Sequence, residues 1–306
     1  MISFRSLLPV AVAAAWAPST RHESQAAPTC SAAAAGETAL APELADSGRI
    51  YRATLAPGGR ELWFFKKVTD DPQAEDYRSY RSRRTEAGWG EAERVDLGGE
   101  FSDLYPTLTH DGQRLAFTSY RPFPGDTSAH PSANLWYADR RGDGWATPVP
   151  ITSAVRPGYY HSQVWFGPGD SLIFRATTPD WETTTTLVSV WSGTGYAAPV
   201  PYEPVERWAD WRPDLHVWGG VPGPGGSVVL EVSALAEDGR RRGPIDLWMA
   251  QRRNREWTEP RPLGGGVNTP GNETFPAVTA DGCGLVFVRD FSSVHLVTLA
   301  AAAPAP

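Results

Sequence analysis

Three carboxylates stand at the same distance from a proline in three separate stretches of the sequence. Asp103, Asp210 and Glu273 each precede a proline by three residues, in D-L-Y-P, D-W-R-P and E-T-F-P. Carboxylates that converge can bind a hard cation such as Ca²⁺ through oxygen, or can divide the acid and base roles of glycoside cleavage between them. They can also accept hydrogen bonds from backbone N–H groups of their own strands. The sequence favours this structural role and leaves the other two open.

Aromatic residues accompany these carboxylates. Tyr160 and His161 occupy the corresponding position in another repeat. Trp208 and Trp211 flank Asp210. Aromatic rings beside carboxylates suit a sugar or a peptide, because the rings bind apolar CH surfaces while the acids bind hydroxyl groups or cations. The candidate ligand-binding mouth therefore comprises Asp103, Asp210, Glu273, Tyr160, His161, Trp208 and Trp211.

Other patterns of catalytic residues are missing from the sequence. It has no G-x-S-x-G motif, which would mark a nucleophilic serine at a strand-to-helix turn. Its histidines have no metal-ligand spacing. We therefore predict no catalytic residue and no cofactor, with Ca²⁺ at the three carboxylates as the remaining alternative.

A repeat of about 56 residues predicts the elements that position these side chains. Turns that contain glycine recur at this spacing, and each is followed by a short run of branched and aromatic residues typical of a buried strand. A second strand pattern and a hairpin that begins with Gly-Trp or a similar pair come next. The turn glycines are Gly58, Gly112, Gly169, Gly225 and Gly282. Each repeat therefore predicts an antiparallel sheet of four strands.

One such sheet cannot cover both of its faces, so neighbouring sheets must stack in a ring. The predicted fold class is all-β, a β-propeller of five four-stranded blades. The last repeat ends at Leu299 without its outer strand, and residues 37–44 carry the same Pro-x-Leu pattern as residues 257–263. We expect an N-terminal strand to complete the last blade, since it would cover an open sheet edge. In the fourth repeat, residues 213–219 offer an alternative inner strand.

Residues 257–290 resemble the TolB-type propellers, which are built from Pro-Asp-Gly repeats. They contain W-x-x-P-x-x-L-G, then V-N-T, then E-x-x-P followed by a D-G turn and L-x-F. Residues 88–122 follow the same pattern, whereas Arg52 and Gln163 stand where the family has its proline. The resemblance extends over residues 36–299, although that family often has six blades. It implies an exported or envelope-associated propeller used for interaction, and it implies no reaction, because one fold hosts both binders and enzymes.

The chain ends and the net charge suggest a location and exclude some partners. Arg5 and the apolar run over residues 7–17 are typical of a signal peptide, and this run is too short to be a transmembrane segment. The predicted domains are a leader over residues 1–35, the propeller over 36–299 and a disordered tail over 300–306. The 306-residue chain has 28 Lys and Arg against 35 Asp and Glu, a net charge of −7, which argues against nucleic-acid binding.

Export to the periplasm or the medium follows from this leader. The residues before Cys30 lack the usual pattern of a lipid-anchor site, and a disulfide between Cys30 and Cys283 is an alternative use of the two cysteines. The predicted function is a non-catalytic exported propeller that binds an envelope protein, a peptide or a glycan. The alternative is a carbohydrate-active hydrolase or lyase that uses the three carboxylates.

Overall fold

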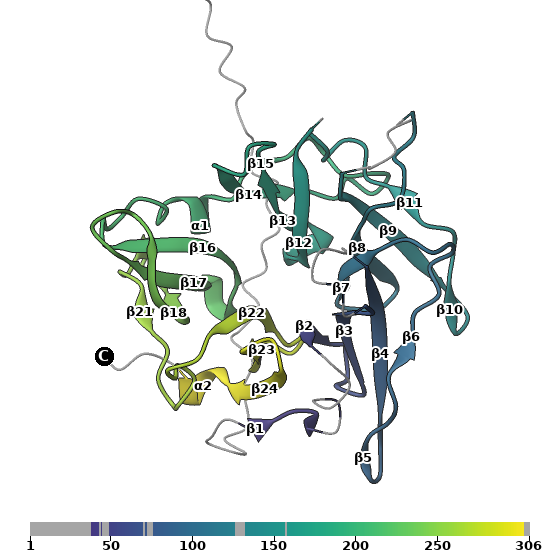
Figure 1. The fold of residues 1–306 in the computed structure, drawn as a ribbon, viewed down its shortest axis with the longest axis horizontal. Helices are drawn as coiled ribbons and strands as arrows, with labels where there is room; N and C mark the ends of the chain where they lie inside the picture. The colour runs from purple at the N-terminus through teal and green to yellow at the C-terminus, as the bar shows by residue number, and fades with distance from the viewer. Residues whose placement is uncertain are drawn as a thin grey trace, which may run out of the picture.

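The computed structural model describes residues 38–302 except 43, 45–48, 70, 72–75, 126–131 and 157. Five antiparallel sheets stand around a common axis as the blades of a propeller (Figure 1). The predicted fold class and number of blades are therefore confirmed. The predicted leader, with its signal peptide and Cys30, lies outside the described residues.

Blades 1 and 2 each have an inner strand next to the axis, two further strands outside it and an outer edge split between two short strands. Blade 1 comprises β2 (Ile50–Leu55), β3 (Glu61–Lys67), β4 (Tyr77–Thr85), β5 (Gly88–Trp89) and β6 (Glu93–Arg94). Blade 2 comprises β7 (Asp103–Leu108), β8 (Arg114–Ser119), β9 (Asn134–Arg141), β10 (Gly144–Trp145) and β11 (Val149–Pro150).

Blades 3 and 4 follow the same order, with a short helix between them. Blade 3 comprises β12 (Tyr160–Phe166), β13 (Leu172–Thr177), β14 (Thr184–Ser189) and β15 (Val200–Pro201). Helix α1 (Glu203–Glu206) leads to blade 4. Blade 4 comprises β16 (Leu215–Pro222), β17 (Val228–Leu235), β18 (Arg241–Ala250) and β21 (Arg261–Pro262), with a separate hairpin of β19 (Arg252–Arg253) and β20 (Glu256–Trp257). The first turns of these two blades contain the 3₁₀ helices η2 (Pro168–Asp170) and η3 (Pro224–Gly226).

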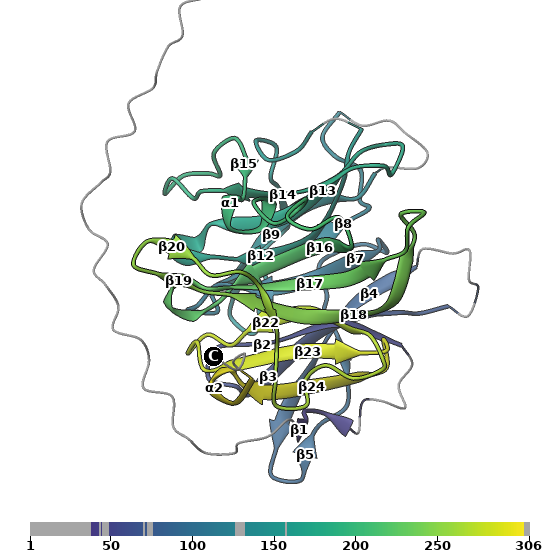
Figure 2. The ribbon, with the colours of Figure 1, turned by 90° about the vertical axis from the view of Figure 1, so that its left-hand side faces the viewer.

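The N-terminal segment completes blade 5. This blade comprises β22 (Glu273–Val278), β23 (Gly284–Arg289), β24 (Ser293–Thr298) and β1 (Thr38–Ala39). β1 pairs antiparallel with β24, with Thr38 opposite Leu296, and Figures 1 and 2 both show the two strands side by side. The predicted closure of the ring by an N-terminal strand is confirmed.

The ordered domain extends beyond the predicted end of the propeller. Helix α2 (Leu299–Ala302) follows β24, and the carbonyl of Ala302 accepts a hydrogen bond of 2.9 Å from the N–H of Gly264. Ala302 is fully buried in the apolar cluster shared by blades 3, 4 and 5, so residues 300–302 are not part of a disordered tail. Cys283, which immediately precedes β23, is disulfide-bonded.

The core is a ring of apolar layers between the blades. Alternate side chains of a strand face opposite neighbours, as the two-residue period of a strand requires. In β3, Trp63 shares a cluster with Phe117 of blade 2, whereas Phe64 shares one with Val288 of blade 5. Burying each such side chain contributes about 1.5–3 kcal/mol, so the stacking of blades stabilises the ring.

Every inner strand carries one extra residue relative to its neighbour. The pairing register shifts by one residue within β2, β7, β12, β16 and β22. The left-handed residues at these bulges are Arg52, Tyr105, Gln163 and Phe275, with φ of 32°, 54°, 50° and 54°, and in β16 Gly219 has a φ of 151°. A positive φ at a residue other than glycine costs on the order of 1–3 kcal/mol, and a bulge redirects the side chain that it carries.

These redirected side chains reach across the propeller axis. Nη1 of Arg52, in blade 1, donates to the carbonyl of Val164, in blade 3. The rings of Tyr105, in blade 2, and Phe275, in blade 5, lie 6.1 Å apart between centroids. Neither pair belongs to adjacent blades. The layer of bulge residues therefore closes the central channel part of the way along its length.

Candidate functional site

Asp103 is held by an arginine of its own blade. Both of its carboxylate oxygens accept hydrogen bonds of 3.0 Å from Nη2 of Arg121, whose Nη1 donates to the carbonyl of Leu97 at 3.2 Å. Both side chains are buried. Burial raises the pKa of Asp103, and the charge of Arg121 opposes that rise. The pair ties the inner strand to the loop that precedes it.

Glu273 repeats this arrangement in blade 5. Its Oε1 accepts a hydrogen bond of 2.9 Å from Nε of Arg289, whose Nη2 donates to the carbonyl of Val267 at 2.9 Å. The carboxylate also accepts from the hydroxyl and the backbone N–H of Thr269, at 2.6 and 3.2 Å. Glu273 thus holds its own blade together. This is the structural role that the sequence favours, with an arginine as an additional partner.

Asp210 does not occupy the corresponding position in blade 4. The inner strand begins at Leu215, so the alternative pattern over 213–219 is the one that forms it, and Asp210 is exposed in the preceding loop. The D-W-R-P sequence does not begin the inner strand, because α1 and the turns after it occupy this stretch and the strand starts later, at Leu215. Trp208 and Trp211 pack edge to face, 5.6 Å apart, in the apolar cluster beside blade 4.

Tyr160 and His161 begin β12 but differ in their surroundings. His161 is fully buried, and its Nε2 accepts a hydrogen bond of 3.1 Å from the backbone N–H of Arg156. Burial lowers the pKa of His161 to about 4, so the ring is neutral at pH 7. Tyr160 lies 5.0 Å from the ring of Trp181, which is 65% exposed. Trp181 lies in a turn outside the repeat pattern, so the pattern of the sequence gives no signal for it.

The structure does not gather the seven predicted residues at one mouth. Two carboxylates are engaged within their own blades, the tryptophans pack beside blade 4, and His161 lies in the interior. In the described part of the chain, no group of three or more His, Cys, Asp or Glu side chains is placed to hold a metal ion. The Ca²⁺ alternative therefore gains no support from the geometry of these carboxylates.

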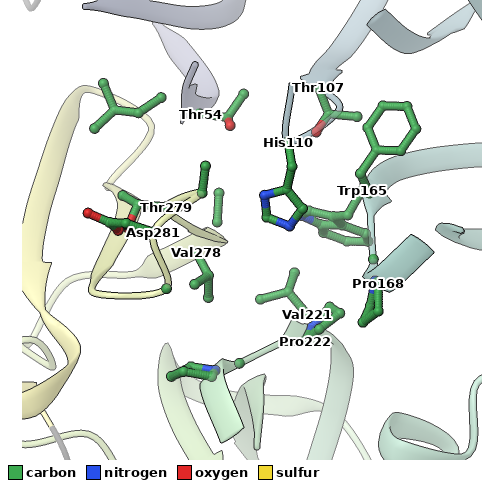
Figure 3. A pocket seen from close by; sticks show the side chains of 18 of the residues that line it. Thr54, Thr107, His110, Trp165, Pro168, Val221, Pro222, Val278, Thr279 and Asp281 are labelled. Carbon is green, nitrogen blue, oxygen red and sulfur yellow. The ribbon is translucent and has the colours of Figure 1, made fainter. Parts of the chain in front are cut away.

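A cavity of about 550 Å³ opens at the other end of the inner strands, where their C-terminal ends meet. All five blades contribute to its wall (Figure 3). In blade order, the labelled side chains are Thr54, then Thr107 and His110, then Trp165 and Pro168, then Val221 and Pro222, and finally Val278, Thr279 and Asp281. The volume lies within the range of small-molecule sites.

Arg52 and Trp165 line this cavity where the axis is closed. The guanidinium group of Arg52 lies over the indole ring of Trp165, with Cζ 4.7 Å from the ring centroid. The indole N–H donates to the carbonyl of Pro276 at 3.2 Å, which fixes the ring. Nη1 of Arg52 donates to Val164, whereas its Nε and Nη2 are buried without a hydrogen-bond partner among the described residues. Burial lowers the pKa of Arg52 to about 9, so the side chain remains a cation at neutral pH.

A second arginine near the axis is paired. Nη2 of Arg175 donates to Oε2 of Glu231 at 2.6 Å, and Oε1 of Glu231 accepts the N–H of Phe275 at 2.8 Å. Gly219 makes room for this pair, because a Cβ there would lie 2.2 Å from Nη2 of Arg175. The charge of Glu231 raises the pKa of Arg52, and that of Arg175 lowers it. Glu231 thus pairs with Arg175, and it acts on Arg52 only through its charge.

The residue type at the bulge of the inner strand is a sequence signal for this central site. The spacing of the repeats places Arg52 and Gln163 opposite the proline of residues 103–106 and 273–276. The strand register instead aligns them with Tyr105 and Phe275, each of which immediately precedes a proline. Arg52, a long cationic residue, therefore stands at a position that carries an aromatic ring in blades 2 and 5.

No protein-family model matches the sequence, and no curated protein matches it. Among solved structures, the chain is similar to BT0996 in its RGII complex, with 12% identity and a TM-score of 0.50 over 82% of this chain and 87% of that protein. It is also similar to a periplasmic gluconolactonase of Pseudomonas aeruginosa, with 17% identity and a TM-score of 0.40 over 78% of this chain. The chain spans 64% of the length of that gluconolactonase. The similarity to BT0996 bears on the fold alone.

No helix among the described residues is long and apolar enough to cross a membrane.

Proposed function

We propose that this chain is an exported, non-catalytic propeller that binds a small ligand in its central cavity. The observation that carries the proposal is a cavity of about 550 Å³ that all five blades enclose and that Arg52 and Trp165 line at its inner end. Concave sites of this size with a few buried polar groups are the usual form of small-molecule sites. The leader sequence and the resemblance to TolB-type propellers support export. The part of the ligand that enters the cavity would belong to an envelope protein, a peptide or a glycan.

The non-catalytic part of the proposal rests on the state of the carboxylates. Acid and base catalysis on a sugar needs two carboxyl groups that can approach the substrate. Asp103 and Glu273 are each engaged by an arginine of their own blade. Asp281, the carboxylate among the described residues that line the cavity, accepts hydrogen bonds from Thr279 and Cys283 within its own turn. The carbohydrate-active alternative therefore gains no support from these groups.

Closing the mouth of the cavity tests the proposal. Val278→Trp places an indole at the rim, and Val149→Trp adds the same side chain on the exposed outer strand of blade 2 as a matched control. A thermal-shift screen would use sugars, sugar acids and short peptides. We expect a ligand that stabilises the wild type and V149W but not V278W, by about 2.7 kcal/mol at 100 times its Kd. Equal responses of V278W and the wild type, or no response to any ligand, would contradict the proposal.

A further inference from the structure

We propose that the ligand of the central cavity carries a single carboxylate group and that Arg52 binds this group. The inference rests on the proposed function, since it names the chemical class of ligand for the same cavity. Its starting point is the pair of nitrogen atoms of Arg52, Nε and Nη2, that no described residue engages.

These two atoms form the edge of a guanidinium group that suits a carboxylate. Nε–H and Nη2–H point in parallel from one side of the planar group, and arginine binds carboxylates through two such parallel hydrogen bonds. The rest of the group is already held. Nη1 donates to the carbonyl of Val164, and the indole of Trp165 lies against one face. Arg52 is therefore oriented before any ligand arrives. Its unengaged edge has almost no exposed surface, so a carboxylate reaches Nε and Nη2 only if the floor of the cavity shifts.

The available edge is buried, which gives a bound anion an energetic advantage. Arg52 is 1% exposed, and a buried N–H group without a partner costs about 1–3 kcal/mol. A buried charge without a counterion is costlier still. A water molecule at these N–H groups would accept their hydrogen bonds but would leave the charge unbalanced. A carboxylate satisfies both requirements.

The charges near the axis favour one carboxylate over a dianion. Among the described residues, Arg175 and Glu231 are the charged groups that act on Arg52, and with Arg52 they sum to one positive charge. Glu231 is engaged by Arg175 and by the N–H of Phe275, so it does not neutralise Arg52 by contact. A bound monocarboxylate would bring the sum to zero. A phosphate monoester, with about two negative charges at pH 7, would leave an excess.

The wall of the cavity suits an organic acid with both polar and apolar parts. The hydroxyl-bearing side chains of Thr54 and Thr107 stand on one side, and Val221 and Val278 provide apolar surface (Figure 3). Such a mixture of apolar lining and a few polar groups fixes the orientation of a small molecule. A free organic acid and the C-terminus of a peptide present the same carboxylate, so both sources belong to the test.

The test compares each acid with a neutral counterpart on the full chain. The pairs are gluconate and glucose, isovalerate and isovaleramide, and acetyl-dialanine with a free or an amidated C-terminus, with inorganic phosphate as a further probe. Calorimetric titration gives the affinities. We expect at least one acid to bind the wild type and its neutral counterpart to bind at least tenfold more weakly. The responding pair distinguishes a small acid from a peptide C-terminus.

Conservative variants show whether Arg52 supplies the contact. Arg52→Lys keeps the charge and removes the fork, so we expect a loss of affinity of tenfold or more. Arg84→Lys is the matched control, because Arg84 also lies over an indole, that of Trp89 at 5.9 Å, but on the surface. R84K should bind the acid as the wild type does.

Three results would overturn the inference. The first is equal affinity for an acid and its neutral counterpart. If V278W then bound neither ligand, the cavity would still be a binding site, and only the carboxylate would be rejected. Tighter binding of phosphate than of every acid would refute the charge argument. A panel in which no acid binds would also reject a monocarboxylate ligand. These comparisons use the wild type, so they decide the matter even where R52K does not fold.

Discussion

Blades 2 and 5 place their buried charges differently from blades 3 and 4, although all four have the same strand order. In blades 2 and 5, a carboxylate at the start of the inner strand pairs with an arginine of the same blade, as Asp103 pairs with Arg121. Blades 3 and 4 instead share one pair, Arg175 and Glu231, which crosses from one blade to the next. The first arrangement stabilises each blade, and the second builds the centre of the ring.

The first turns separate the same two groups of blades. In blade 2 the side chain of Asp111 accepts hydrogen bonds from the hydroxyl of Thr109 and the N–H of Gln113, at 2.6 and 2.9 Å, and blade 5 has the same turn. In blades 3 and 4 the hydroxyls of Ser171 and Ser227 bond to a proline carbonyl instead. The two blades with the Asp-Gly turn hold their charges internally, and blades 3 and 4, which lack it, contribute charges to the centre.

The largest effect should come from breaking the pair at the centre. Glu231→Ala leaves Arg175 buried without its partner and removes the acceptor for the N–H of Phe275, so we expect a loss of about 3–5 kcal/mol in the free energy of unfolding. The double variant Arg175→Met with Glu231→Leu should recover much of this loss, because apolar side chains can replace a whole buried pair. Urea denaturation measures both. A single variant as stable as the wild type would show that the pair does not stabilise the centre.

The carboxylates within the blades should give a smaller effect that is similar in the two blades. Asp103→Asn and Glu273→Gln each weaken a buried ion pair, for which we expect a loss of about 1–3 kcal/mol. Asp210→Asn is the control, since an exposed substitution usually changes stability by less than about 0.5 kcal/mol. The same denaturation experiment ranks the three variants. A loss for D210N as large as for the other two would contradict the positions described above.

The smallest effect should depend on pH. Burial, with the charge of Glu273, raises the pKa of Asp246 to about 6. A folded-state pKa above the unfolded value means that this group lowers stability as pH rises through about 4 to 6. Blade 2 has Asn134 in the matching N-L-W sequence. Asp246→Asn should therefore raise stability at pH 7 by about 1 kcal/mol, reduced by partial exposure, and by much less at pH 4. An equal gain at both pH values would refute this assignment.

The sequence predicted the fold well because the propeller pattern is local. Turn glycines about 56 residues apart and the strands after them lie close along the chain, and the Pro-x-Leu pattern of residues 37–44 predicted the partner of β24. Helix α2 was missed because a short alanine-rich segment carries little signal of its own. Its order comes from burial of residues such as Ala302 between distant blades.

The site was harder to predict because its contacts are not local. The pairing registers place Arg52 and Gln163 one residue before the position of the proline in blades 2 and 5, whereas the spacing in the sequence had placed them at the proline itself. The contact of Arg52 with Val164 joins blades that are adjacent neither in sequence nor in the ring. Spacing therefore identified carboxylates that stabilise single blades, and could not identify the arginine at the axis.

A crystal structure of the wild-type protein with the acid that binds most tightly tests the central claim most directly. The account predicts a carboxylate in the central cavity, with its two oxygens about 2.7–2.9 Å from Nε and Nη2 of Arg52. It also predicts that the Arg175–Glu231 pair stays intact. An acid bound elsewhere on the molecule, with only water at Nε and Nη2 of Arg52, would contradict it.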